Sequence, residues 1–112
     1  ELKYIGTLCV EFFIDRNDNL YVNEIAPRVH NSGHLTINAF NISQFENHIR
    51  AVCSLEQIPL KKLHNAEMIN LIGNQITPYR QNRNLNDNEF FFDYQKKEIK
   101  EKRKMGHLTK IL

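Results

Sequence analysis

The first quarter of the chain has the pattern of a β-hairpin. Residues 4–14 are rich in β-branched and aromatic side chains, which is the composition of a strand. Residues 15–19 are Asp and Asn apart from one Arg, and Asp and Asn tolerate tight turns. Residues 20–25 then predict a returning strand, and residues 26–33, which contain Pro27, predict a loop.

A capped helix is predicted next. Ser43 and Glu46 form a capping box, in which the hydroxyl accepts from the Glu46 amide and the carboxylate reaches back to the Ser43 amide. Apolar residues then recur at helical spacing, at Phe45, Ile49 and Val52. The pattern predicts one amphipathic helix that ends at about Cys53.

The second half of the chain is richer in strands. Residues 66–72 predict a strand that Gly73 ends, and residues 77–89 are polar and typical of a loop. Residues 90–94 and 105–112 predict two further short strands. The fold class is therefore expected to be α+β, with helix and strand mixed along the chain.

Composition narrows the class of protein. The chain is 41% hydrophobic and 25% charged, which is typical of a folded domain and not of a disordered chain. No apolar run approaches the roughly 18 residues of a membrane span, so we expect no membrane partner. Cys9 and Cys53 are expected to be buried reduced thiols, which suits a cytoplasmic protein.

Charge divides the chain into two expected parts, residues 1–55 and residues 56–112. The first carries 4 basic and 6 acidic side chains, and the second carries 11 and 7. Residues 96–110 hold 7 of the basic side chains, against Glu98 and Glu101. Such a cluster predicts an anionic partner, either a phosphate, a nucleic acid or an acidic surface.

Two glutamates interrupt the apolar strands of the predicted hairpin. If the hairpin closes with Asp15 opposite Leu20, Glu11 faces Glu24 across the ladder, whereas a slip of one residue would separate them. Like charges directly opposite destabilise a sheet unless they are neutralised, and Mg²⁺ binds one or two carboxylates. The alternatives are a magnesium site and two unrelated glutamates that face solvent.

The segment from Asn23 to His34 concentrates polar chemistry. His30 and His34 have the spacing of a zinc pair on a helix, but the proline and glycine of this segment predict a loop, which argues against zinc. Arg28 offers a planar fork for a carboxylate, bicarbonate or phosphoryl oxygen, and His30 could donate to the same anion or shuttle a proton. The alternative is that both side chains cap backbone carbonyls.

Five runs of the sequence together carry a resemblance to a known family: Val22–His34, Ser43–Glu46, Ala66–Gly73, Tyr94–Lys96 and Arg103–His107. They resemble the 5-(carboxyamino)imidazole ribonucleotide synthase family. The members of this family are purine-biosynthesis ligases of the ATP-grasp superfamily. The resemblance covers nearly the whole chain. It implies that residues 1–55 are the C-terminal part of an ATP-grasp domain and that residues 56–112 form a small β-rich C-terminal domain.

The resemblance also implies the nucleotide and metal site. Glu11 and Glu24 resemble the acidic pair that holds Mg²⁺ on the phosphates of ATP. Asn23, together with Glu24, lies in the matching nucleotide site. This agrees with the cross-strand argument for a magnesium site.

The implied reaction joins bicarbonate to 5-aminoimidazole ribonucleotide while ATP is cleaved to ADP and phosphate. All three partners are small molecules, and no nucleic acid is implied. The implied catalytic residues are Arg28, His30 and Lys96. The implied substrate-binding residues are Arg28, His30, Asn31, Ser32, Lys96 and Arg103.

Three positions depart from the family pattern. Leu35 stands where the family usually has an aromatic residue, Gln95 stands where it has Gly, and Glu101 lies inside the basic run. These departures leave the reaction class intact. They leave open whether Lys96 or Lys97 is the active-site lysine.

The resemblance begins partway into the ATP-grasp domain. We therefore expect the chain to be the C-terminal portion of a longer enzyme, inactive or nearly so by itself, whose full-length form is a homodimer. Within the chain, we expect Lys96 and Arg103 to approach Arg28 and His30.

Two alternatives stay open. One is a sister ATP-grasp ligase, such as a formate-dependent glycinamide ribonucleotide transformylase or a biotin carboxylase. The other is a small nucleic-acid-binding module that uses residues 96–110 for phosphates and nearby aromatic rings for bases. Those rings belong to Phe90, Phe91, Phe92 and Tyr94, of which we expect at least Phe91 to lie in the core.

Overall fold

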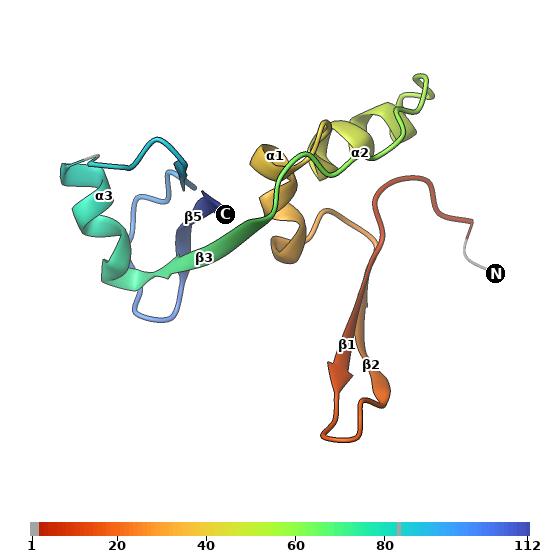
Figure 1. Ribbon diagram of the computed structural model, residues 1–112, viewed down its shortest axis with the longest axis horizontal. Coiled ribbons are helices and arrows are strands. Elements are labelled where there is room, and N and C mark those ends of the chain that lie inside the picture. The colour runs from red at the N-terminus through yellow and green to blue at the C-terminus, as the bar shows by residue number, and fades with distance from the viewer. Residues whose placement is uncertain (1–2, 83) are drawn as a thin grey trace. The chain divides into compact units, whose positions relative to one another are not determined.

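The structure is a computed structural model that describes residues 3–82 and 84–112. Contacts between residues divide the chain into two compact units. The first unit holds the chain up to Ile37 together with Asn41–Lys61, and the second holds Asn38–Phe40 and Lys62–Leu112. Both units mix helix and strand (Figure 1), so the expected α+β class is confirmed.

The first unit contains the predicted antiparallel hairpin, formed by β1 (Cys9–Ile14) and β2 (Leu20–Ala26). The first strand is shorter than the expected residues 4–14. The cause lies at Thr7, whose backbone amide donates to Nδ1 of His48 at 3.2 Å. Because this amide bonds to a side chain of α2, the segment before β1 is attached to α2 and is not part of the β1–β2 ladder.

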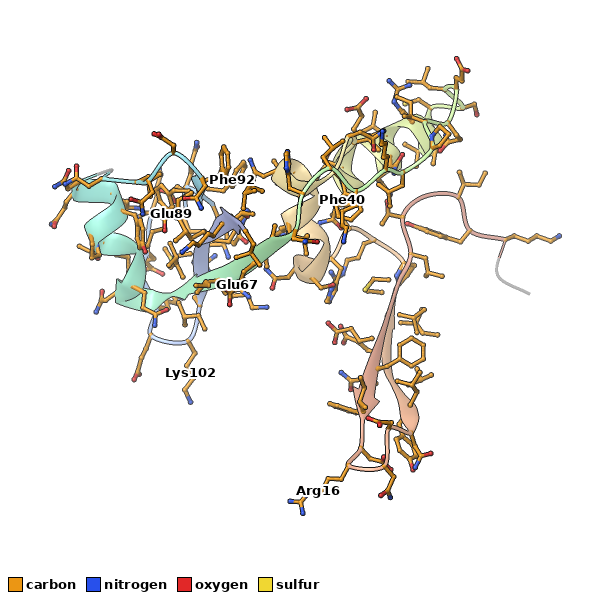
Figure 2. The ribbon with its side chains drawn as sticks, viewed as in Figure 1. Arg16, Phe40, Glu67, Glu89, Phe92 and Lys102 are labelled. Carbon is orange, nitrogen blue, oxygen red and sulfur yellow. The ribbon has the colours of Figure 1, made fainter. Side chains whose placement is uncertain are left out.

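The turn of the hairpin is organised by Asp15. Its carboxylate accepts hydrogen bonds from the backbone amides of Asn17 and Asn19, at 2.8 and 2.9 Å, and from the Asn19 side chain at 3.0 Å. These bonds, with that from the Asn19 side chain first, hold the pKa of the Asp15 carboxyl below its usual value. Asp18 adopts the left-handed conformation that the predicted turn residues tolerate, and Arg16 extends from the tip (Figure 2).

A β-bulge at Asn23 sets the register of the hairpin. Leu20 faces Ile14 and not Asp15, so the predicted pairing of Asp15 with Leu20 is wrong. Between Leu20 and Glu24, however, β2 contains one residue more than the facing part of β1, and the ladder shifts by one at the bulge. Glu11 consequently faces Glu24, as the sequence predicts.

Two short helices follow the hairpin, the 3₁₀ helix η1 (Asn31–Leu35) and α1 (Thr36–Ala39). The predicted loop over residues 26–33 is therefore wrong from Asn31 onward, where η1 begins. The side chain of His30 caps η1 by accepting a hydrogen bond from the backbone amide of Ser32. This local cap stabilises a helical turn that is too short to leave an apolar pattern in the sequence.

The predicted capped helix is α2 (Gln44–Val52). Of the two hydrogen bonds predicted for its capping box, the one accepted by Ser43 is present. Oγ of Ser43 accepts from the Glu46 amide at 3.1 Å, whereas the Glu46 carboxylate forms an ion pair with Arg50 at 2.9 Å. The helix ends at Val52 with Cys53 as its C-cap, which agrees with the predicted end at about Cys53. Its apolar residues are exposed, namely Phe45, Ile49 and Val52.

The second unit is built on a three-stranded antiparallel sheet in the order β3–β5–β4. The strands are β3 (Ala66–Ile72), β4 (Glu89–Asp93) and β5 (Lys104–Ile111), which agree with the three predicted strands. Phe92 projects from β4 and Lys102 lies in the loop between β4 and β5 (Figure 2).

Two short helices connect β3 to β4, the 3₁₀ helix η2 (Gly73–Ile76) and α3 (Thr77–Gln81). The expected loop over residues 77–89 is wrong at its start, because Pro78 occupies the first turn of α3, where its missing amide costs nothing. Gly73 has a φ of 54°, and a Cβ there would lie 2.7 Å from the carbonyl oxygen of Glu101.

The core of the second unit lies between the sheet and these helices. Leu71, Ile76 and Met105 are buried together, and Tyr79 and Phe91 pack against them. The predicted place of Phe91 in the core is confirmed, and its ring stacks on that of Tyr79 at 5.3 Å.

Cys9 and Cys53 are both free thiols, but Cys53 is exposed, so the expected burial of that thiol is wrong. Across the described residues, every helix is too short or too polar to cross a membrane. The expected domains, residues 1–55 and 56–112, stay a prediction.

Truncating the core of the second unit should destabilise it strongly. Met105 is fully buried between β5 and the helices, so Met105→Ala should lower the free energy of unfolding by about 2–5 kcal/mol. Urea unfolding followed by circular dichroism measures this change. Ile69→Ala, on the exposed face of β3, is the control and should cost much less. Equal losses from the two variants would contradict this assignment of the core.

Candidate functional site

Three side chains of the first unit form a compact cluster of ligand atoms. Nε2 of His30 lies 3.3 Å from Oε1 of Glu11 and 3.2 Å from Oε1 of Glu24. One ligand atom from each residue lies within 4.8 Å of the other two. The imidazole side chain is 12% exposed, whereas the Glu24 side chain is 50% exposed. The cluster is therefore closed by His30 on one side and reachable through the carboxylates.

The bulge brings an amide to the same cluster. Nδ2 of Asn23 donates to Oε2 of Glu11 at 3.2 Å. In a regular strand Asn23 and Glu24 would point to opposite faces, but a bulge lets neighbouring side chains share one side. Sequence reasoning placed Asn23 here only through the family resemblance, because the bulge leaves no mark in the apolar pattern.

The ring of His30 is held in one orientation by Ser32. The Ser32 backbone amide donates to Nδ1 at 3.3 Å, and the Ser32 hydroxyl lies 2.9 Å from the same nitrogen. Because Nδ1 accepts a hydrogen bond, the proton of the neutral ring is on Nε2, which donates to the two carboxylates. His30 thus acts in this structure as a donor to the acidic pair.

Gln44, which the sequence did not single out as a site residue, fixes the backbone of His30. Its Oε1 accepts from the His30 amide at 2.9 Å, and its Nε2 donates to the His30 carbonyl at 2.7 Å. The same Nε2 lies 2.7 Å from Nδ1 of His34. Gln44 is buried, with 7% of its surface exposed, so these bonds form away from water. Its sequence signals were a polar residue beside the helix cap and its place in the run Ser43–Glu46, neither of which pointed to His30.

Gly33 leaves room for the Gln44 side chain. A Cβ on Gly33 would lie 2.5 Å from Oε1 of Gln44. Thr36 supports the arrangement from the other side, because its hydroxyl donates to the Gly33 carbonyl at 2.6 Å and accepts from the Gln44 amide at 2.9 Å. The start of α2 is thereby joined to the loop that carries His30.

The two histidines of the loop have different partners. His30 contacts the glutamates, whereas the ring of His34 stacks on Phe45 with centroids 5.3 Å apart. In the part of the chain that the structure describes, the cluster of possible metal ligands contains His30 and not His34. The two imidazoles therefore have separate surroundings, although the loop on which the argument against zinc relied is replaced by η1 from Asn31 onward.

Of the other predicted residues of the loop, Ser32 contacts the cluster through His30, and Arg28 bonds within the loop. Arg28 is exposed, and its Nη1 donates to the Val29 carbonyl at 3.0 Å, which is the carbonyl-capping alternative for this side chain. Asn31 opens η1, and the exposed Ser32 contacts His30 as described.

In the second unit, Lys96 is held near the start of β5. Its Nζ donates to the Lys104 carbonyl at 2.6 Å and lies 5.2 Å from the centre of the Tyr94 ring. The Tyr94 hydroxyl lies 3.0 Å from Nδ1 of His107, which is 1% exposed. Lys97 is exposed beside it, so the contacts distinguish the two lysines and favour Lys96 as the ordered one.

Arg103 lies one residue before β5. Its amide donates to the Lys100 carbonyl at 2.9 Å, and its carbonyl accepts from Gly73 at 2.9 Å, while the residue as a whole is exposed. Arg103 and Lys96 belong to the second unit, and Arg28 and His30 belong to the first. The expected approach of these two pairs stays a prediction.

The acidic cluster presents ligand atoms of the kind that a divalent cation takes. Glu11 and Glu24 present carboxylate oxygens, the ligands that Mg²⁺ prefers, from facing positions of the ladder. Their mutual repulsion is offset only in part by the donors of Asn23 and His30. The donor set therefore fits magnesium through its two carboxylates.

Two protein-family models match the chain, one in each half of the sequence. Residues 1–45 match the ATP-grasp domain. Residues 66–112 match the phosphoribosylaminoimidazole carboxylase C-terminal domain. The two matches agree with the domain types expected from the family resemblance.

Individual relatives match over nearly the whole chain. N5-carboxyaminoimidazole ribonucleotide synthase of Bacillus subtilis (strain 168) is 44% identical over 109 residues, which are 97% of this chain and 29% of that protein. The chain thus spans less than a third of the length of such curated relatives.

Solved structures agree with this. The crystal structure of N5-carboxyaminoimidazole synthetase from Staphylococcus aureus has a TM-score of 0.88 at 45% identity, and covers 97% of this chain and 30% of its own. N5-carboxyaminoimidazole synthase from Aspergillus clavatus, in complex with ADP and 5-aminoimidazole ribonucleotide, has a TM-score of 0.84 at 35% identity, and covers 96% and 30%.

The family resemblance drawn from the sequence motifs is confirmed by these matches. The chain belongs to the N5-carboxyaminoimidazole ribonucleotide synthase family, within which it joins an ATP-grasp segment to a phosphoribosylaminoimidazole carboxylase C-terminal domain.

Proposed function

We propose that the protein carrying this chain joins bicarbonate to 5-aminoimidazole ribonucleotide, with cleavage of ATP to ADP and phosphate. The observation that carries the proposal is the cluster of Glu11, Glu24 and His30 on the ATP-grasp segment. It combines a divalent-cation site with a hydrogen-bond donor. The names of the relatives and the ligands of the Aspergillus clavatus structure support the same reaction.

Glu11 and Glu24 would hold Mg²⁺, and Asn23 would lie beside them in the nucleotide site. Bound there, the ion would neutralise phosphate charge during phosphoryl transfer. The chain's own contribution is to present both carboxylates on one side of the ladder, which the bulge at Asn23 achieves. We propose ATP and Mg²⁺ as the nucleotide and ion.

The neighbouring loop would bind the bicarbonate-derived group. The exposed guanidinium of Arg28 can exchange its bond to the Val29 carbonyl for two parallel bonds to an oxyanion. His30, held by Ser32 and Gln44, would orient its proton on Nε2 toward the same region. Asn31 would complete the binding loop.

The basic residues of the second unit would bind the ribonucleotide. We propose that Lys96 approaches the reacting centre and that Arg103 binds the 5′-phosphate. Both are cations in the family's C-terminal domain, and an anionic substrate is what a basic cluster of this kind attracts.

Several further expectations belong to this proposal. The chain spans 29% of the length of its relatives, so we propose that it is inactive by itself. We also propose a homodimer at full length, a cytoplasmic location, and neither a nucleic-acid nor a membrane partner.

Metal binding tests the acidic pair directly. Mn²⁺, as a paramagnetic stand-in for Mg²⁺, should bind the chain with an affinity that falls at least tenfold in Glu24→Gln, because one of the two carboxylate ligands is lost. Electron paramagnetic resonance of free Mn²⁺ measures this. Glu46→Gln removes a carboxylate from α2 and should leave the affinity unchanged. Equal affinities for all three proteins would contradict the site.

Turnover tests the reaction. ADP release by the protein that contains this chain at its full encoded length should require ATP, Mg²⁺, bicarbonate and 5-aminoimidazole ribonucleotide together. Arg28→Ala should lower kcat/KM by about 100-fold or more, because a cationic donor to a developing oxyanion is lost. The 112 residues alone should release no ADP.

Two results would count against this assignment. ADP release with glycinamide ribonucleotide and formate, in place of bicarbonate and 5-aminoimidazole ribonucleotide, would favour the sister ligase. Full activity of Arg28→Ala would remove that residue from the reaction. Thr77→Ala, at the start of α3 in the second unit, is a control that should keep its activity.

A further inference from the structure

The run Arg103–His107 ends on a buried histidine of β5 to which the proposed reaction assigns no role. His107 is 1% exposed and pairs across the sheet with Phe92 of β4, which Figure 2 labels. The two rings are stacked, with centroids 5.4 Å apart and planes 4° from parallel. Residues paired across a ladder point to the same face of a sheet. The strand pairing therefore sets the position of the imidazole.

Tyr94 is a second neighbour of His107 on this face. The backbone amide of Tyr94 donates to the Met105 carbonyl at 2.9 Å, which continues the pairing of β4 with β5. Since Tyr94 follows Phe92 by two residues, alternation along the strand places both side chains on the same face. The Tyr94 hydroxyl forms a hydrogen bond with Nδ1 of His107 at 3.0 Å, and the ring centroids are 5.6 Å apart. The buried imidazole thereby holds the far end of the phenol.

The Lys96 ammonium lies over the ring of Tyr94. Its Nζ is 5.2 Å from the ring centroid, within the roughly 6 Å over which a cation is attracted to an aromatic face. Nζ also donates to the Lys104 carbonyl, at the start of β5, at 2.6 Å. A lysine stem is flexible, so contacts of this kind decide where the ammonium rests. A ring face and a carbonyl carry no full charge, and they hold the ammonium without neutralising it.

We propose that Tyr94 is a positioning residue for Lys96 and that His107 acts through Tyr94. The hydrogen bond to His107 holds the phenol in one orientation, and the face of the phenol holds the ammonium beside Lys104. An anionic substrate then meets a cation whose position is already set, so less ordering is needed on binding. The part that concerns the substrate rests on the proposed function, whereas the position of the ammonium does not.

Nuclear magnetic resonance of the Lys96 ε-methylene group tests the position, in the protein that contains this chain at its full encoded length. The signal is assigned by its loss in Lys96→Arg, and the ring current of Tyr94 should displace it from the usual lysine value. Tyr94→Phe keeps the ring but removes the hydroxyl, so this displacement should shrink toward zero. Tyr79→Phe removes a hydroxyl from the ring that stacks on Phe91, and should leave the signal in place. An unchanged signal in Tyr94→Phe overturns the proposal.

Two substitutions of His107 separate the hydrogen bond from the packing around it. His107→Asn and His107→Leu both remove the imidazole that stacks on Phe92, but only the asparagine amide can still bond to the Tyr94 hydroxyl. The displacement of the Lys96 signal should therefore be larger in His107→Asn than in His107→Leu. Equal displacements would mean that His107 acts through packing alone, and would overturn the proposal. Tyr94→Phe leaves the buried imidazole in place and decides the matter if neither variant folds.

Kinetics connect the position of the ammonium to the substrate. Tyr94→Phe should raise KM for 5-aminoimidazole ribonucleotide by about 10-fold with a smaller change in kcat, since a misplaced group weakens binding. Tyr79→Phe should leave KM unchanged. A shifted Lys96 signal in Tyr94→Phe with unchanged KM supports the positioning role and removes Lys96 from the substrate site. A raised KM with an unchanged Lys96 signal overturns the positioning role, because Tyr94 would then act on the substrate by another route.

Discussion

Two carboxylates that face each other across a two-stranded ladder are the constraint on which the first unit depends. Like charges in this arrangement destabilise a sheet, yet the bulge at Asn23 brings Glu11 and Glu24 into register. The Asn23 amide and the His30 ring supply donors that offset part of the repulsion. The facing carboxylates and the donors around them are thus one arrangement, and the proposed cation site depends on the same register.

The position of the His30 ring, which donates to Glu11 and Glu24, depends on the loop that carries it. A loop of this kind could hold the His30 ring in several orientations, but the buried Gln44 bonds both peptide groups of that residue. Gln44 is in turn fixed by the cap of α2 and by Thr36. The first turn of α2 thus holds the loop of His30, and His48, further along the same helix, holds the segment before β1.

Patterns within a few residues predicted much of this structure, and contacts between distant residues account for the rest. Alternating apolar residues predicted the strands, and the cap at Ser43 predicted α2. The short helices were missed because a turn or two of helix carries too little periodicity, and caps decide whether it forms. The pairing of Glu11 with Glu24 was predicted from a register that a bulge then altered. Gln44 was missed because its partners lie 10 and 14 residues away.

The choice between Lys96 and Lys97 shows what local conformation adds to a sequence motif. Glycine before the lysine would take a left-handed conformation without strain, and Gln95 takes the same conformation at φ 55°. The substitution therefore preserves the direction of the chain, provided that the amide of residue 95 keeps its bond to Asp93. With the direction preserved, the side chain of Lys96 is the one that reaches the Tyr94 ring and β5. The departure from the family motif is thus compensated within the turn, and it gives no reason to shift the role to Lys97.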